Sequence, residues 1–507
     1  MSNKTQRVRF VLLLLLLSAA VVPLSGAGPK TRWVGSWAAS QQLVEPNNAL
    51  SPEDLRGATL RQVVHLSIGG NEFRLHLSNR FGSTPLNVTA VHIARAASPD
   101  SSKIVPASEK ALTFSGSPDV TIPPHADFLS DPVALAADAL SDLAITLHLE
   151  TAPDEQTGHP GSRAMSYVTQ GNLVSATELQ AAKTLDHWYF IAGIDVIAPA
   201  EANAIVVLGD SITDGRGATT NGNDRWTDVL ARRLQALAGT HNIAVLNQGI
   251  GGNHLLSDGL GPNALSRFDH DVIAQAGVRY LVVFEGINDI GMLARKQDVT
   301  QKEHDTLVHR MAAAYEQIIA RAHTNDIRVI GATLTPFVGS NYYHPAQVND
   351  ADRQAVNEWI RSPGHFDAVI DFDKVTRDPQ HPERLLTAFD CGDHLHPSPA
   401  GYGAMAQAVP VSVFENAEIS STIRFQREYG KLDLDPAVAT QRGAAWRLQQ
   451  RFSNACFSPM IQRRTSSRAT LVAGPAGFNC FRGSTASQLT APSTHKAAAT
   501  RKDAVQP

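Results

Sequence analysis

Five short apolar segments alternate with helix-like stretches in the second half of the chain, and this rhythm constrains the fold more than any other feature. The expected strands are residues 205–208, 243–246, 280–284, 329–334 and 368–372. Between them, apolar side chains recur at helical spacing from Trp226 to Leu237 and over residues 302–324. Near-continuous apolar strands alternating with helices are typical of a parallel sheet covered on both faces. We therefore expect an α/β domain over residues 199–415.

Residues 28–198 follow a different pattern, in which apolar and polar side chains alternate with a period of two. Residues 63–68 and 73–78 flank Gly69-Gly70-Asn71 and predict a β-hairpin. Residues 88–94 and 143–149 alternate in the same way, and helical periodicity is scarce. Short strands separated by Gly and Pro favour an antiparallel β-sandwich or jelly roll.

Residues 1–27 are typical of a secretory signal peptide. A basic start is followed by an apolar run of 13 residues, Phe10 to Val22, and then by the small residues Ser25-Gly26-Ala27. A membrane span needs roughly 20 apolar residues, so an uncleaved anchor is the less favoured reading. We expect a secreted protein, extracellular or periplasmic, with no integral membrane segment after cleavage.

The last segment, residues 416–507, is basic and rich in Ser, Thr and Ala. It holds 13 Lys or Arg against 5 Asp or Glu, a surplus of +8, while residues 28–415 carry −15. This composition predicts a mostly disordered tail. A solvated tail is the simplest reading, and adhesion to acidic cell-surface polymer is the alternative. The acidic body argues against a nucleic-acid partner.

The cysteine pattern predicts neither a disulfide scaffold nor a metal centre. The chain has three cysteines, Cys391, Cys456 and Cys480, and neither a CxxC nor an HExxH motif. Cys456–Cys480 is the first candidate for a disulfide, and Cys391 is read as a small residue packed on a tight loop. We expect no metal and no cofactor.

Four polar motifs follow expected strands or lie on the last loop of the α/β region. Their central residues are Ser211 in Gly209-Asp210-Ser211, Gly252, Asn288, and the pair Asp393 and His396. Because ligands gather at the carboxyl edge of open parallel sheets, these motifs are expected to meet there.

The residue types at these positions predict acyl transfer. Ser211 would be the nucleophile, His396 the base, and Asp393 the carboxylate that orients the imidazole. The backbone N–H groups of Ser211 and Gly252 and the side-chain amide of Asn288 would stabilise the oxyanion. His394 is a rival base, and Asp210 is expected to bond local backbone N–H groups.

These motifs resemble those of the SGNH, or GDSL, hydrolase superfamily, in which Ile212 here replaces the Leu of the GDSL name. The resemblance covers roughly residues 203–415. It implies a flavodoxin-like three-layer α/β/α domain that hydrolyses esters without metal, with functional positions matching Ser211, Gly252, Asn288, Asp393 and His396. Trp33-Val34-Gly35-Ser36-Trp37 and the β-rich segment resemble secreted xylan esterase-like members associated with polysaccharides.

The expected function is a secreted serine esterase acting on a small-molecule or polysaccharide ester, with O-acetyl groups of a carbohydrate as the leading substrate. A lipase or lysophospholipase is the alternative within the enzymes. An acyltransferase and a non-catalytic carbohydrate-binding protein are the alternatives outside ester hydrolysis. The sequence leaves open the acyl group, the alcohol and the oligomeric state.

Overall fold

The structure, a computed structural model, describes residues 30–414, and its first part is built of antiparallel strands. Two short helices, α2 (Pro52–Leu55) and η1 (Pro106–Ser108), interrupt them. The strands are β1 (Thr31–Ala38), β2 (Gln42–Leu43), β3 (Ala58–His65), β4 (Gly70–Ser78), β5 (Leu86–Arg95), β6 (Lys110–Ala111), β7 (Val120–Ile122), β8 (Asp127–Leu129), β9 (Val133–Ala137), β10 (Asp142–Leu149), β11 (Thr157–His159), β12 (Ser166–Gln170), β13 (Lys183–Leu185), β14 (Trp188–Tyr189) and β15 (Ile191–Pro199). The β-rich character predicted for this region is confirmed.

These strands form two larger sheets and one of three strands, so the predicted hairpin is wrong. One sheet has the order β1-β15-β4-β8, with β9 also on β4. Another has the order β13-β12-β3-β10-β5-β6, with β7 also on β5. The third is β14-β11-β2. Both edges of β3 and of β4 are occupied by other strands, which excludes pairing between them. Residues 66–69 therefore carry the chain from one sheet to the other, and Gly70 and Asn71 already belong to β4.

The second part holds a parallel sheet of five strands, which confirms the five predicted segments. The strands are β16 (Asn203–Gly209), β17 (Ile243–Gly249), β18 (Val278–Phe284), β19 (Arg328–Ala332) and β20 (Ala368–Ile370). Their order is β17-β16-β18-β19-β20, with every neighbouring pair parallel. In chain order this is 2-1-3-4-5, the flavodoxin-like arrangement, whose ligands bind where the order reverses, next to the first strand.

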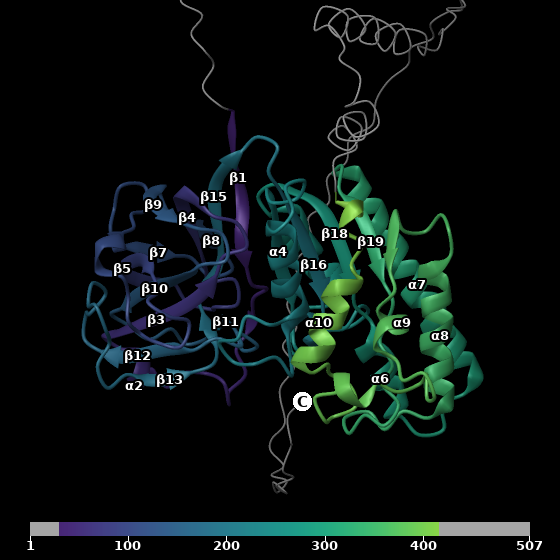
Figure 1. Ribbon diagram of the computed structural model, residues 1–507. Helices are drawn as coiled ribbons and strands as arrows, with labels where there is room; N and C mark the ends of the chain where they lie inside the picture. The colour runs from purple at the N-terminus through teal and green to yellow at the C-terminus, as the bar shows by residue number, and fades with distance from the viewer. Residues whose placement is uncertain (1–29, 415–507) are drawn as a thin grey trace, which may run out of the picture. The chain divides into compact units, whose positions relative to one another are not determined.

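Helices pack along this sheet in two groups. They are α3 (Ser211–Asp214), α4 (Trp226–Gln235), α5 (Ala264–Phe268), η2 (Asp269–Ile273), α6 (Ile287–Ala294), α7 (Gln301–Thr324), α8 (Gln347–Arg361), α9 (Phe372–Thr376), η3 (Thr387–Phe389), α10 (Pro399–Ala408) and η4 (Val411–Val413). Helices α4 and α10 pack together, with α4 against β17, while α7 and α8 lie side by side against β19 (Figure 1). The helices predicted from Trp226 and over residues 302–324 are confirmed as α4 and α7. Within residues 30–414, no helix combines the length and apolarity needed to cross a bilayer.

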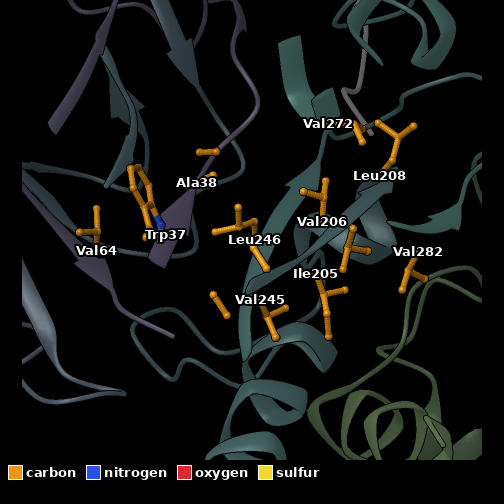
Figure 2. Packing of buried hydrophobic residues seen from close by; sticks show 14 of the residues in the cluster. Trp37, Ala38, Val64, Ile205, Val206, Leu208, Val245, Leu246, Val272 and Val282 are labelled. Atoms are coloured by element: carbon orange, nitrogen blue, oxygen red, sulfur yellow. The ribbon is translucent and has the colours of Figure 1, made fainter. Parts of the chain in front are cut away.

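The β-rich part and the parallel sheet share one hydrophobic core. Strand β1 packs against β17, and buried Val34 and Trp37 belong to the same cluster as Leu246. Figure 2 shows part of it, with Trp37 and Val64 from the β-rich part and Leu246 and Val282 from the parallel sheet. Only residues 200–202 separate β15 from β16. The two parts are therefore joined by packed side chains, which allows the β-rich part to contact the site described below.

The predictions for both ends of the chain lie outside the described residues. These are the signal peptide at residues 1–27, the basic tail at 416–507, and the Cys456–Cys480 pair.

Candidate active site

Ser211 lies where β16 gives way to a short helix. β16 ends at Gly209, and the carboxylate of Asp210 caps the following helix α3 by accepting the backbone N–H of Ile212 at 2.8 Å. This is the local role predicted for Asp210. Ser211 is therefore the first residue of α3, where backbone N–H groups have no acceptor within the helix. Its surface is 8% exposed, so the serine is almost fully buried.

The structure brings Ser211, His396 and Asp393 together although 185 positions separate the first two. Ser211 Oγ lies 2.8 Å from Nε2 of His396, and Nδ1 of His396 lies 2.6 Å from Oδ2 of Asp393. The rival base, His394, pairs instead with Asp390 at 2.6 Å, and its side chain is 54% exposed. The hydrogen-bond geometry therefore singles out His396 as the partner of the serine.

The loop that carries His396 fixes both the carboxylate and the ring. Oδ1 of Asp393 accepts the backbone N–H groups of Leu395 at 3.0 Å and His396 at 2.9 Å. These bonds and the imidazole hold the pKa of Asp393 well below its usual range, against the effect of burial. Burial lowers the pKa of His396, and the Asp393 bond opposes this only in part. At neutral pH the pair is therefore a carboxylate beside a neutral imidazole.

Gly252 lies on the loop after β17 and Asn288 in the first turn of α6, and these two segments contact each other. Gly252 has φ +66°, in the left-handed region that favours glycine, inside a turn closed by the Asn253 N–H and the Ile250 carbonyl at 3.2 Å. The Asn288 amide donates to the Asn253 carbonyl at 2.7 Å. The Gly252 loop is also bonded to β16, because the N–H of Ile250 donates to the Gly209 carbonyl at 3.1 Å.

Tyr343 fixes the amide of Asn288 and was missed by the sequence analysis. Its hydroxyl donates to Oδ1 of Asn288 at 2.7 Å, so the NH₂ group of that amide must point the other way. One of its two N–H groups bonds the Asn253 carbonyl, which leaves the second for another acceptor. The signal for Tyr343 was its position in a polar loop after the fourth parallel strand.

Arg267 is the centre of a buried network beneath the site, and sequence reasoning missed it as well. Its guanidinium donates to the carbonyls of Gly209 at 2.9 Å and Gln248 at 2.7 Å, and to Oδ1 of Asn253 at 3.0 Å. It also pairs with Asp271 at 2.8 Å. The side chain therefore ties the ends of β16 and β17 to the loop of Gly252.

Three further carboxyl groups, those of Asp210, Glu285 and Asp289, are buried and desolvated. Burial raises the pKa of Glu285 well above its ordinary value, and the charge of Asp210 adds to this effect. Burial also raises the pKa of Asp210, and the charge of Asp289 adds to that shift. Burial also raises the pKa of Asp289 to about 6, although the backbone N–H groups of Leu255 and Leu256 bond its carboxylate and oppose this. At neutral pH these three carboxyl groups are therefore not all ionised.

The β-rich part contacts the serine helix directly through His159. Nε2 of His159 lies 2.8 Å from Oδ1 of Asp214, the last residue of α3, and its Nδ1 lies 2.8 Å from the Ser40 carbonyl. Both side chains are almost fully buried. The start of α4 is held in the same way, because Arg225 donates to the Ser162 carbonyl while Trp226 is buried against Phe372.

Asp390, Cys391 and Asp393 are the residues in the described part of the chain whose side chains could together approach a metal ion. Their ligand atoms lie within 4.8 Å of one another. Both carboxylates are already engaged by histidines, and a metal would require the thiolate form of the cysteine. Desolvation by the loop and the charge of Asp393 raise the pKa of the Cys391 thiol to about 11, even though the residue is exposed. The donor set therefore fits a metal poorly.

Comparison with known proteins gives a family match over the α/β part. Residues 207–404 match the GDSL-like Lipase/Acylhydrolase family. The comparison with curated proteins gives no match.

Similar solved structures include three hydrolases. The M. smegmatis aryl esterase is 15% identical, over 42% of this chain and 99% of that one, with a TM-score of 0.32. A GDSL-like lipase from Bacteroides thetaiotaomicron VPI-5482 is 17% identical, over 42% of this chain and 88% of that one, with a TM-score of 0.30. An alpha/beta hydrolase enzyme from the metagenome of Lake Arreo is 21% identical, over 41% of this chain and 92% of that one, with a TM-score of 0.29. On the family match, residues 207–404 form a domain of the GDSL-like lipase/acylhydrolase family, and the protein is an ester-hydrolysing hydrolase.

Proposed function

We propose that this protein is a serine esterase that works through Ser211, His396 and Asp393. The observation that carries the proposal is the unbroken chain of hydrogen bonds from Ser211 Oγ to His396 Nε2 at 2.8 Å and from His396 Nδ1 to Asp393 at 2.6 Å. A nucleophile bonded to a base that is itself oriented by a third group is the arrangement needed for covalent acyl transfer.

In this mechanism, Ser211 Oγ attacks the ester carbonyl while its proton moves to Nε2 of His396. Asp393 accepts the Nδ1 proton and stabilises the imidazolium. The oxyanion is bound by the backbone N–H groups of Ser211 and Gly252 and by the second amide N–H of Asn288. Collapse expels the alcohol, which takes the proton from Nε2. Water, deprotonated by His396, then attacks the acyl-serine and releases the carboxylic acid.

The pH dependence of this reaction is expected to reflect the lowered pKa of His396. The base works only when neutral, and burial disfavours its charged form. The midpoint of the acidic limb of kcat/KM should therefore fall below the ordinary histidine value of about 6.5. Initial rates on p-nitrophenyl acetate between pH 4 and 9 measure it. A midpoint above that value would show that His396 is not the titrating base or is not desolvated.

For the substrate, we propose O-acetyl groups on a carbohydrate, encountered outside the cell. The support is the sequence resemblance of the N-terminal region to polysaccharide-associated esterases and the signal-like residues 1–27. N-terminal sequencing of the exported protein checks the second point: a chain beginning near Gly28 supports export, and an intact Met1 contradicts it.

A chain-length series tests the proposed substrate class. We expect kcat/KM to fall steeply from p-nitrophenyl acetate through butyrate to octanoate, and acetate to be released from acetylated xylan. A rise with chain length, with no acetate released, would instead support the lipase alternative. Chemical deacetylation of the xylan beforehand is the matched control, because it removes the scissile bond and leaves the polysaccharide.

A further inference from the structure

Arg216 lies beside the serine and the histidine on the loop that follows α3. Its backbone N–H donates to the Ser211 carbonyl at 2.9 Å. The next residue, Gly217, packs so closely on the Pro397 carbonyl, directly after His396, that a side chain there would collide with it. The Arg216 guanidinium lies 3.3 Å from the hydroxyl of Tyr342, whose ring meets the His396 ring edge to face at 5.8 Å. The Arg216 segment thus contacts both the helix that begins at Ser211 and the loop that carries His396, and its guanidinium lies beside the tyrosine that packs on His396.

Arg163 comes from the β-rich part and is bonded to the same loop through its backbone. Its carbonyl accepts the backbone N–H of Asn221 at 2.9 Å, which joins it to the loop that carries Arg216. Two residues earlier, Gly161 is pressed against the Asp214 carboxylate at the end of α3. Arg163 itself adopts φ +49°, a conformation that L-residues rarely occupy, and its buried Nε has no hydrogen-bond partner among the described residues. The two arginines act on His396 from outside its own loop, and both lower its pKa.

Among the described residues, neither guanidinium has a carboxylate partner. In residues 30–414, arginines deeper in the fold such as Arg267 and Arg353 pair with acids, whereas no ion pair involves Arg163 or Arg216. Two unpaired cations next to a residue that must become an imidazolium oppose the reaction, since they disfavour its charge. An anion bound to the two arginines would offset their positive charge, and so favour the step in which His396 becomes an imidazolium.

We propose that Arg163 and Arg216 form a subsite for a carboxylate on the substrate, close to the ester bond that is cleaved. Guanidinium groups bind carboxylates through paired N–H bonds, which gives orientation as well as attraction. This inference rests on the proposed serine-esterase function and narrows its substrate class to acidic esters. The carboxylate can belong to the acyl group or to the alcohol, as in a uronic acid, and the substrates below distinguish these two sources.

Pairs of esters that differ only in one charge test the subsite. Mono-p-nitrophenyl succinate and its methyl ester place the carboxylate on the acyl side. An O-acetylated methyl galacturonoside and its methyl ester place it on the alcohol side, with acetate release as the readout. We expect wild-type kcat/KM to favour the acidic member of one pair by roughly 10- to 100-fold, the range for hydrogen bonds to charged groups. The preference should shrink at high salt because exposed charges are screened.

The variants Arg163→Gln and Arg216→Gln are each expected to abolish most of this preference, and Arg→Lys variants to retain part of it. Arg279→Gln is the matched control: it removes the same charge from an exposed position at the opposite end of β18, and the preference should persist. Equal rates within both ester pairs for the wild type, with p-nitrophenyl acetate hydrolysed, would overturn the subsite and leave the esterase proposal intact. Failure to hydrolyse any ester would overturn both. The wild-type comparison needs no variant, so it decides the question even where a variant misfolds.

Discussion

Ser211→Ala is expected to lower kcat on p-nitrophenyl acetate by about 10⁴- to 10⁶-fold, as in serine hydrolases whose nucleophile is removed. The change deletes the atom that forms the acyl-enzyme and leaves the oxyanion donors in place. Because Ser211 begins a helix and alanine is the best helix former, the fold should not suffer. Stopped assays at high enzyme concentration measure the residual rate, and circular dichroism checks the fold. Ser83→Ala, at an exposed position, is the control and should keep its activity.

The histidine offers a still closer comparison, because two candidates lie two residues apart. His396→Ala should lose activity on the scale of Ser211→Ala, since these side chains act as a unit. His394→Ala should stay within a few-fold of wild type, because that ring is half exposed and paired with Asp390. Should Ser211→Ala keep a tenth of the wild-type rate, some other nucleophile does the chemistry. Loss of activity with retained polysaccharide binding in Ser211→Ala separates the enzyme from the non-catalytic carbohydrate-binding alternative, which predicts no change in either.

Much of the site could be predicted from the sequence because the sheet is parallel. Buried parallel strands are apolar on both faces, so their ends are visible as sudden changes to Gly, Asp and Asn. Ser211, Gly252 and Asn288 each follow such an end within a few residues. Their convergence follows from the rule that parallel strands present their carboxyl ends at one edge. The spacing of Asp393 and His396 on one loop predicts that they act as a pair, and the structure gives a 2.6 Å hydrogen bond between their side chains.

The supporting side chains could not be predicted, because their roles depend on packing between distant segments. Arg267 and Asp271 read locally as a helical ion pair on a solvated face, yet the arginine is 2% exposed and bonds the ends of two strands. His159 lies on a short β-strand, and nothing near it in sequence indicates that it contacts Asp214. The predicted hairpin failed for a related reason: turn residues are local signals, whereas the partners of β3 and β4 are distant in sequence.

Arg267→Met is expected to lower the free energy of unfolding by about 3–5 kcal/mol, the usual cost of removing one partner from a buried ion pair. The change removes the arginine partner of Asp271 and leaves that carboxylate with His270 and Ser40. It also removes the guanidinium that lies 3.7 Å from the Glu285 carboxylate. It also leaves the Gly209 and Gln248 carbonyls without this donor in a buried setting. Urea unfolding followed by tryptophan fluorescence measures the loss as a lower midpoint.

Arg267→Lys separates charge from geometry in this network. Lysine keeps the positive charge near Asp271 but cannot donate at once to two strand carbonyls and the Asn253 side chain, since it lacks the planar fork of arginine. We expect an intermediate loss of stability and a lower kcat, because the ends of β16 and β17 position Ser211 and the Gly252 loop. Arg279→Met, at an exposed position without an ion pair in the described residues, should change stability by no more than about 0.5 kcal/mol. If the free energy of unfolding of Arg267→Met is as close to the wild-type value as that of this control, the arginine does not stabilise the fold. The ends of the strands are then held by their own backbone hydrogen bonds.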